Sequence, residues 1–375
     1  MSYKISVIVP IFNVERYITE ALDSIIHQTI GINNIEVIMV DDCSTDNSPN
    51  IIDDYASKYD NFKAIHLPEN SHFAGKPRNV GINNSNGNYL MFLDPDDYFV
   101  DDACEVLYDL ILKEDNDLSF GIYGKLVNNT KIKVNFDDRG FKNTDTVKIS
   151  DICENSNLLR IPPAIASKIF KATFIKENNI FFPEGIPGQD LVFVINSLLK
   201  AKKISFLNNY VVYYYRTRNT KGDKSVSFNR NKSYLSGLIN AYMLSLKLLK
   251  DFNNEKYLPN IFDGHIGYWI NQLLSSNLNK NELKELFKES ELMFEECKKG
   301  NVNPKYLKSI PLFNSLIEKR YDEAILLIEN NKLKKRLKSK NKQIAILKTS
   351  KGWFKYKSKN IYLRLKVKMV GQDYE

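Results

Sequence analysis

Three aspartates in one short turn are the first residues of this sequence whose types and spacing could do chemistry. Asp94, Asp96 and Asp97 follow directly after the apolar run Tyr89–Leu93. Carboxylates held this close raise each other's pKa unless a cation joins them. Oxygen ligands of this kind suit Mg²⁺ or Mn²⁺, which bind through one or two carboxylates and the phosphates of a substrate. A helix N-cap is the alternative, because Asp97 or Asp101 could cap the helix expected to follow.

Short apolar runs predict the sheet that positions these acidic residues. Strands are expected at Lys4–Val9, Ile35–Val40, Lys63–Leu67 and Tyr89–Leu93, and helices at Tyr17–Ile26, Ser48–Tyr59 and Arg78–Asn84. Strands that alternate with helices predict a parallel sheet of Rossmann type, in which ligands collect beyond the carboxyl ends of the strands. Asp41 and Asp42 follow the second strand, so we expect both acidic groups at the same edge of the sheet.

The second part of the chain has a helical pattern. From Asn231 onward leucines and aromatic residues recur at helical spacing, and residues 312–347 predict one or two long helices. Leu333, Leu337, Ile344 and Leu347 give a short coiled-coil signal, so these helices could join copies of the chain in a homo-oligomer. We therefore expect a sheet-containing domain in residues 1–230, a helical domain in residues 231–330 and a helical or amphipathic tail in residues 331–375.

The tail is strongly basic. Residues 331–375 hold 15 Lys or Arg against 2 Asp or Glu, within a chain of net charge +8, so the body is acidic. Aromatic residues among these lysines, such as Trp353 and Tyr356, suit an anionic surface, either membrane phospholipid or a polyanionic acceptor. A solvated helix or a disordered end is the alternative. Nucleic acid is disfavoured as a partner, because the body is acidic and no groove-reading or RNA-binding motif is found.

The cellular compartment is predicted from what the sequence lacks. The first residues run into an apolar strand without the features of a secretory signal, and no apolar run has the length of about 20 residues that crosses a bilayer. Four scattered cysteines form no C-x-x-C pair, which fits a reducing compartment. We expect a cytoplasmic protein, and the basic tail could attach it peripherally to the inner face of the plasma membrane.

Several ordered motifs together resemble glycosyltransferase family 2. They are Val7–Asn13, Val40–Asp46, Lys76–Gly81 and Leu93–Asp97. Further segments resemble the enzymes that add N-acetylglucosamine to poly(ribitol phosphate) teichoic acids. These segments are Asn70, Gly75–Val80, Phe181–Glu184 and Gln189-Asp190. The resemblance covers residues 4 to about 230. It implies a GT-A fold, a Rossmann-like mixed sheet flanked by helices, which makes residues 1–230 a nucleotide-sugar-binding catalytic domain. A smaller helical C-terminal region follows it here.

The resemblance also implies a site for a nucleoside diphosphate. Pro10 and Phe12 would flank the nucleobase, and Asp42, or else Asp41, would accept a hydrogen bond from the uracil N3 proton. Asn70 would face the nucleotide.

The diphosphate and the metal would lie beside this nucleotide site. Arg78 would pair with the diphosphate, where a guanidinium can bind oxygens in a forked arrangement. Asp94 would touch the ribose or the metal, and Asp96 would be the principal metal ligand. A surface arginine with an ordinary salt bridge is the alternative for Arg78.

The proposed general base is Asp190. In an inverting transfer a carboxylate must take the proton of the attacking hydroxyl, and Asp190 follows a turn rich in glycine and proline at the position of the family's base. It could instead, or also, cap the helix Leu191–Leu199. Gln189 stands where related enzymes usually carry Glu, which removes an electrostatic partner of the base.

Three cations complete the expected donor or acceptor loops. Lys76 precedes Arg78, and Arg216 and Arg218 end the expected strand Val211–Arg218, which in similar enzymes leads into a loop that closes on phosphate. An edge strand with solvated arginines is the alternative.

The resemblance, together with these residues, implies an inverting, metal-dependent glycosyltransferase. It would move N-acetylglucosamine or another hexose from a UDP-sugar to a hydroxyl of a glycan or polyol phosphate such as teichoic acid, with Mn²⁺ or Mg²⁺. A nucleotidyltransferase should show a glycine-rich phosphate loop after the first strand, where Pro10–Asn13 offers none, and a dehydrogenase should show G-x-G-x-x-G there. A non-catalytic membrane-associated scaffold is disfavoured, since the acidic and basic residues above are intact.

Overall fold

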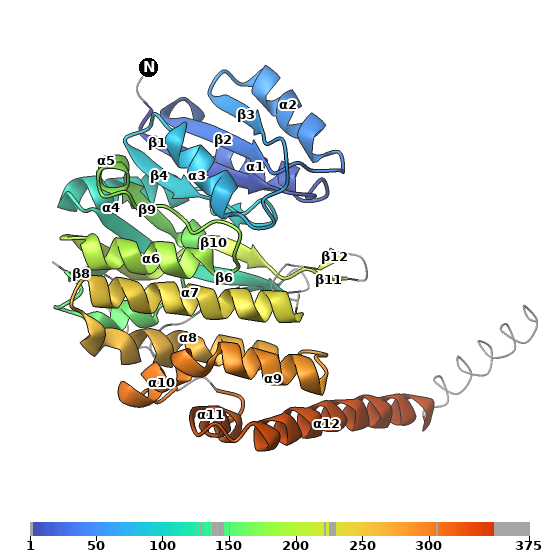
Figure 1. Cartoon of the computed structure of the whole chain (residues 1–375). Helices are drawn as coiled ribbons and strands as arrows, with labels where there is room; N and C mark the ends of the chain where they lie inside the picture. The colour runs from blue at the N-terminus through green and yellow to red at the C-terminus, as the bar shows by residue number, and fades with distance from the viewer. Residues whose placement is uncertain are drawn as a thin grey trace, which may run out of the picture.

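A computed structural model describes residues 3–127, 130–134, 136, 141, 146–149, 151–220, 223–224, 230–304 and 307–348. Within these residues ten strands form one mixed sheet, in the order β3-β2-β1-β4-β9-β6-β10-β5, with β7 paired to β6 and β8 to β10 (Figure 1). The strands are β1 (Ile5–Ile11), β2 (Ile35–Asp41), β3 (Phe62–His66), β4 (Tyr89–Phe92), β5 (Tyr98–Phe99), β6 (Leu118–Val127), β7 (Thr130–Lys133), β8 (Thr146–Ile149), β9 (Lys168–Lys171) and β10 (Ile204–Arg216). A separate hairpin is formed by β11 (Asn219–Thr220) and β12 (Asp223–Lys224).

The first half of the sheet is parallel, as predicted. β1 pairs in parallel with β2 and β4, and β2 pairs in parallel with β3. All seven residues of β1 and of β2 are buried, which is what β-branched runs in a covered parallel sheet require. β9 then runs antiparallel between β4 and β6, so the complete sheet is mixed, as the GT-A resemblance implies.

Helices cover both faces of the sheet. They are α1 (Ile18–Ile26), α2 (Ser48–Lys58), α3 (Gly75–Asn83), α4 (Ala103–Glu114), α5 (Ala172–Glu177), α6 (Gln189–Lys200), α7 (Lys232–Asp251), α8 (Leu258–Leu273), α9 (Lys280–Glu289), α10 (Glu291–Lys299), α11 (Ile310–Ile317) and α12 (Tyr321–Lys348). One apolar cluster joins the sheet to α1, α2 and α4 on one face. A second cluster begins at the other face, under α3 and α6, and continues through α7 to the first turns of α12.

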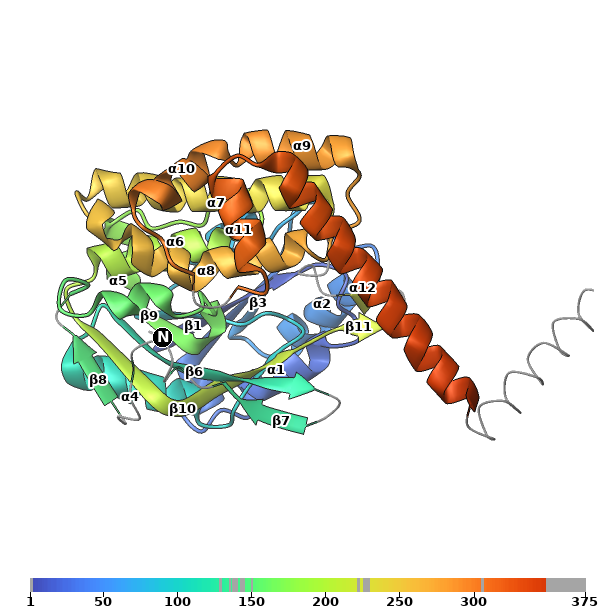
Figure 2. The same ribbon diagram turned by 90° about the horizontal axis from the view of Figure 1, so that it is seen from below.

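The C-terminal helices stack beyond α6, away from the sheet (Figures 1 and 2). The predicted long helical stretch consists of α11 and α12, and α12 extends from the body with Leu333 and Leu337 more than half exposed. The end of the predicted tail, residues 349–375, lies outside the described residues. No helix in the described ranges is long and apolar enough to span a bilayer.

Candidate active site

Three segments that are distant in the sequence meet beyond the carboxyl end of β4. They are the acidic turn, residues 94–97; the helix α3; and the segment 181–190 that leads into α6. Asn79 of α3 fixes that segment, because its Nδ2 donates to the Phe182 carbonyl oxygen and its Oδ1 accepts from the Phe182 amide, both at 2.9 Å. Gly75 makes the close approach feasible, since a Cβ there would lie 2.3 Å from the Pro183 carbonyl oxygen.

Arg78 lies at the centre of this meeting point. Its Nη2 pairs with Asp94 Oδ1 at 2.6 Å, and its guanidinium lies 5.1 Å from the centre of the Phe182 ring. The residue is 4% exposed, and its Nε and Nη1 have no hydrogen-bond partner in the described part of the chain. Arg78 is thus a buried cation with unused donors, not the surface arginine considered as the alternative.

The acidic turn is bound to the end of β10. Asp96 pairs with Arg218 at 2.7 Å, and Asp97 accepts a hydrogen bond of 2.7 Å from the backbone amide of Arg216. Burial raises the pKa of Asp96, with Arg218 acting in the opposite direction. Burial, followed by the nearby carboxylates of Asp96 and Asp94, raises the pKa of Asp97 well above its ordinary value. The carboxylates are therefore as crowded as their spacing suggested.

Neither Asp97 nor Asp101 caps the following helix. α4 begins with Asp102 at the N-cap position, and no side-chain cap hydrogen bond is made there. Asp102 instead accepts a hydrogen bond of 2.7 Å from Tyr210. The turn consequently has no helix-capping function in this structure.

The arginines at the end of β10 are engaged on the body of the protein. The Nε of Arg216 donates to the Asp96 carbonyl oxygen at 3.0 Å, and its Nη2 pairs with Glu20 at 2.5 Å. The guanidinium of Arg216 lies 5.4 Å from the centre of the Tyr17 ring. The guanidinium of Arg218 lies 5.6 Å from the same ring. The alternative of solvated edge arginines therefore does not describe them.

The acidic turn has the donor chemistry of a divalent-cation site but no complete ligand set. In the described residues no group of three or more His, Cys, Asp or Glu side chains is arranged to hold a metal ion. Asp94 and Asp96 are each paired with an arginine. Two carboxylates that need phosphate oxygens to complete a coordination shell still fit Mg²⁺ or Mn²⁺, which bind in that way.

The expected nucleotide residues line the same edge of the sheet at the ends of β1 and β2. Asp42 is buried, and its carboxylate accepts from the Ser71 amide at 3.0 Å and the Ser71 hydroxyl at 2.9 Å. Asn70 Nδ2 donates to the Asp42 carbonyl oxygen at 2.9 Å. Burial raises the pKa of Asp42, opposed by these Ser71 hydrogen bonds and by the charge of Lys76. Asp42 and Asn70 therefore form one rigid unit.

The other expected base contacts differ in exposure. Pro10 is buried in β1, whereas the ring of Phe12 is 45% exposed and free to stack on a base. Asp41 is buried, accepts from the Ser44 amide at 3.2 Å and lies 3.3 Å from His66 Nδ1. Lys76 is held loosely, with its Nζ 3.7 Å from Glu69.

Asp190 lies in the first turn of α6, where Gly188 with φ of 75° is the N-cap. Asp190 is not the N-cap itself, because the helix begins one residue earlier, at Gln189. Its Oδ1 accepts a hydrogen bond from the Leu191 amide at 3.0 Å. Burial raises the pKa of Asp190; the Arg78 guanidinium opposes this change and Asp94 adds to it. A partly buried carboxylate whose proton affinity is raised, close to Arg78 and the acidic turn, has the properties of a general base. Its neighbour Gln189 is buried.

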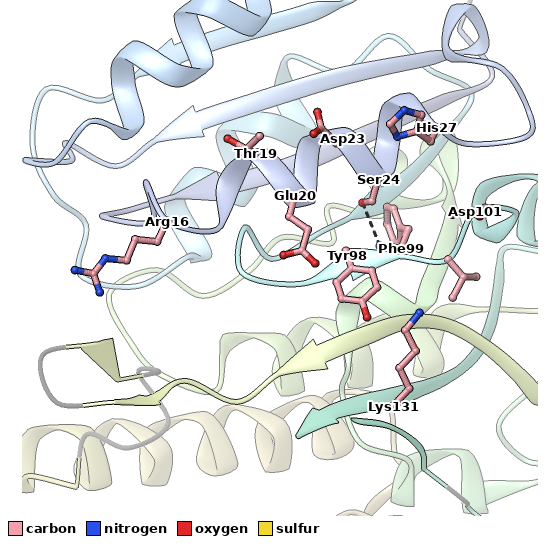
Figure 3. Close-up of a pocket in the computed structure, with 11 residues that line it drawn as sticks. Arg16, Thr19, Glu20, Asp23, Ser24, His27, Tyr98, Phe99, Asp101 and Lys131 are labelled. Atoms are coloured by element: carbon pink, nitrogen blue, oxygen red, sulfur yellow. Dashed lines mark hydrogen bonds between the residues drawn. The ribbon is translucent and has the colours of Figure 1, made fainter. Parts of the chain in front are cut away.

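A cavity of about 580 Å³ lies between α1, β5 and β7, and one of the residues that line it is Glu20, the ion-pair partner of Arg216. In Figure 3 the Glu20 carboxylate points toward the ring of Tyr98, and Lys131 reaches toward the hydroxyl end of Tyr98 from β7. Sequence reasoning missed Tyr17 and Glu20, which hold Arg216. Glu20 is 196 residues away from Arg216, so no local pattern could have revealed the pair.

Comparisons with known proteins agree with this geometry. The family model Glycosyl transferase family 2 matches residues 6–154. A poly(ribitol-phosphate) beta-glucosyltransferase of Bacillus spizizenii is 36% identical over 216 residues, 56% of this chain and 32% of that protein. Glycosyltransferase GlyG of Streptococcus pneumoniae is 31% identical over 229 residues, 58% of this chain and 72% of that protein.

Solved structures give the same result. The crystal structure of Staphylococcus aureus TarS 1–349 in complex with UDP-GlcNAc is 25% identical, with a TM-score of 0.69, and the match covers 88% of this chain and 92% of that one. The match to the Bacillus spizizenii protein, by contrast, spans about a third of that protein's length.

Proposed function

The chain belongs to glycosyltransferase family 2, and from that premise we propose that it transfers a sugar from a UDP-sugar to a hydroxyl group of a cell-surface polymer. N-acetylglucosamine or another hexose is the proposed sugar, and a polyol phosphate such as teichoic acid is the proposed acceptor. The similarity to a poly(ribitol-phosphate) glucosyltransferase and to TarS with UDP-GlcNAc supports both choices.

The observation that carries the proposal is the pairing of Arg78 with the acidic turn beside Asp190. A buried guanidinium with unused donors can bind a diphosphate, and an adjacent carboxylate of raised pKa can accept a proton. Both groups lie beyond the carboxyl end of β4, where ligands of such sheets bind.

We propose a single inverting displacement. Asp190 takes the proton of the acceptor hydroxyl, whose oxygen forms a bond to the anomeric carbon. The bond from that carbon to the diphosphate oxygen breaks, and UDP leaves with the electron pair. Arg78 holds the diphosphate in place, so that the hydroxyl attacks from the opposite face.

We assign the metal-holding residues as Asp94 and Asp96. Bound Mg²⁺ or Mn²⁺ would neutralise the charge that develops on the departing diphosphate. Arg218, which pairs with Asp96, lies beside these carboxylates, and Arg216 keeps the end of β10 against the acidic turn through Glu20. Pro10, Phe12, Asp42 and Asn70 would bind the uridine.

The test is a direct transfer assay on the full chain. We expect UDP-GlcNAc or UDP-glucose, with Mn²⁺ or Mg²⁺, to release UDP and to add a hexose mass to poly(ribitol phosphate). Asp190→Asn should still bind UDP but should lose at least about 100-fold in turnover, the scale of a lost general base. A thermal-shift screen in which UDP, GDP, CDP and TDP sugars all leave the melting temperature unchanged would contradict the proposal.

A further inference from the structure

Lys168 is a buried cation that the proposed mechanism has not used. It is the first residue of β9 and is 2% exposed. Its Nζ donates to the Ala164 carbonyl oxygen at 2.8 Å and lies 5.3 Å from the centre of the Phe120 ring. No ion pair joins Lys168 to a carboxylate in the described part of the chain, although burying an ammonium group without such a partner is unfavourable.

The strand register places Lys168 beside the candidate active site. β9 is antiparallel to β4, with Met91 opposite Ile169, so Lys168 lies next to the end of β4 from which the acidic turn begins. Side chains alternate along a strand, which puts Lys168 on the same face as Phe170. The Phe170 ring packs 5.4 Å from that of Phe193 in α6, the helix whose first turn carries Asp190.

Asp190 is the carboxylate whose negative charge acts on Lys168. Burial lowers the pKa of Lys168 to about 7, and the charge of Asp190 acts in the opposite direction. The titratable and charged groups around Asp190 are Arg78 on α3, Asp94 in the acidic turn, Lys168 on β9, Tyr234 and Tyr242 on α7, and Tyr268 on α8. Burial raises the pKa of all three tyrosines, so they remain neutral, and Arg78 already forms an ion pair with Asp94.

We propose that Lys168 is a positioning residue that keeps the Asp190 carboxylate ionised, acting as an internal positive charge behind the site. This role rests on the proposed transfer reaction. A positive charge on Lys168 favours the ionised carboxylate of Asp190 and therefore lowers the pKa of Asp190, as this role requires. Burial raises the pKa of Asp190, so a positive charge on Lys168 opposes the loss of charge from Asp190 as the pH falls.

The experiment removes only this charge. Lys168→Met fills the same space without a charge, and Lys168→Gln retains a donor toward the Ala164 carbonyl. Lys171→Met is the matched control, because Lys171 lies on the same strand and pairs with Asp115 at 3.0 Å on the surface. Turnover is measured against pH with a UDP-sugar and poly(ribitol phosphate).

In both Lys168 variants we expect the acid limb of the pH–turnover profile to move up by about half to one pH unit. Turnover on that limb should fall by about 3- to 10-fold. The plateau and the UDP dissociation constant should stay unchanged.

A second measurement separates this inference from the proposed function. The ¹³C carboxyl resonance of Asp190, assigned through its absence in Asp190→Asn, reports the titration of that group without any transfer. We expect its midpoint to rise in Lys168→Met and not in Lys171→Met. An unmoved midpoint in folded Lys168 variants would overturn the role of Lys168, and so would failure of both variants to fold, because either result marks a purely structural lysine. Absence of transfer by the wild-type chain would instead count against the proposed function.

Discussion

Arg78 makes an ion pair with Asp94 and lies over the Phe182 ring, and two of its buried nitrogen atoms have no hydrogen-bond partner among the described residues. Replacing it with Met should weaken UDP binding by about 10- to 100-fold, because a charge-assisted hydrogen bond contributes about 1.5–3 kcal/mol. Arg78→Lys should restore only part of that affinity, since an ammonium group lacks the forked geometry of a guanidinium. Titration calorimetry with UDP measures the effect.

The control for this prediction is Arg320→Met. Arg320 is about half exposed and pairs with Glu318 on the surface of the helical region. Its loss should leave UDP affinity unchanged. Equal UDP affinity in Arg78→Met and wild type, with both folded by circular dichroism, would remove Arg78 from the nucleotide site.

The sequence was informative for residues that lie in local motifs and uninformative for long-range partners. Arg78, Asp94, Asp96 and Asp190 were proposed as site residues from their motifs, and the structure brings them together. The sequence did not predict which residues pair with these side chains. Arg218 meets Asp96 across more than a hundred residues, and nothing in the run around Lys168 marks it as a buried cation.

At the scale of elements, the orientation of α3 depends on one close approach. A Cβ at Gly75 would lie 2.3 Å from the Pro183 carbonyl oxygen, which real side chains do not tolerate. Gly75→Ala should therefore push α3 away from the segment before α6, lower the free energy of unfolding by about 1–3 kcal/mol and weaken UDP binding. Chemical denaturation and calorimetry measure the two effects.

Asn83→Ala is the matched control on the same helix. Asn83 is exposed in the last turn of α3 and makes none of the contacts that place Arg78. Its replacement should change the free energy of unfolding by no more than about 0.5 kcal/mol. If Gly75→Ala proved as stable as Asn83→Ala, the backbone would have room that the structure does not show.

The predictability of the elements followed their burial. β1 and β2 are buried along their whole length, and the sequence marks them as β-branched runs. The sequence did not predict β6, and it predicted only the end of β10, residues 211–216. Polar residues interrupt the apolar pattern of β10, which contains asparagines and has register shifts in its pairing with β6. Helix α3 starts three residues before the predicted Arg78, since Gly75 and Pro77 weaken a helical signal although Pro is tolerated in a first turn.

At the scale of the whole molecule, positive charge is concentrated where the chain leaves its core. The start of α12 is anchored by Ala324, Ile325 and Ile328, whereas Leu333 and Leu337 are more than half exposed. Figure 1 shows α12 extending away from the stacked helices. Within the described residues, the exposed part of α12 thus lies apart from the acidic turn and Asp190. We propose that the basic residues from Leu333 onward serve a separate task, attachment to an anionic surface.

Truncation after Lys332 tests this separation. It keeps the buried start of α12 and the hydrogen bonds of Asn331 and Lys332 to the body. It removes the basic residues that follow, together with the exposed hydrogen bond of Lys335 to Ser275. We expect unchanged UDP affinity and unchanged thermal unfolding, because the apolar cluster ends at Ile328.

Sedimentation of the shortened chain with vesicles rich in phosphatidylserine should fall strongly, because each Lys or Arg near such a surface contributes about 1 kcal/mol. Neutral phosphatidylcholine vesicles and a salt series serve as controls, since the attraction is electrostatic and weakens as the Debye length shortens. Equal sedimentation of the full and shortened chains would assign the basic segment to another partner, either the polyanionic acceptor or a second copy of the chain.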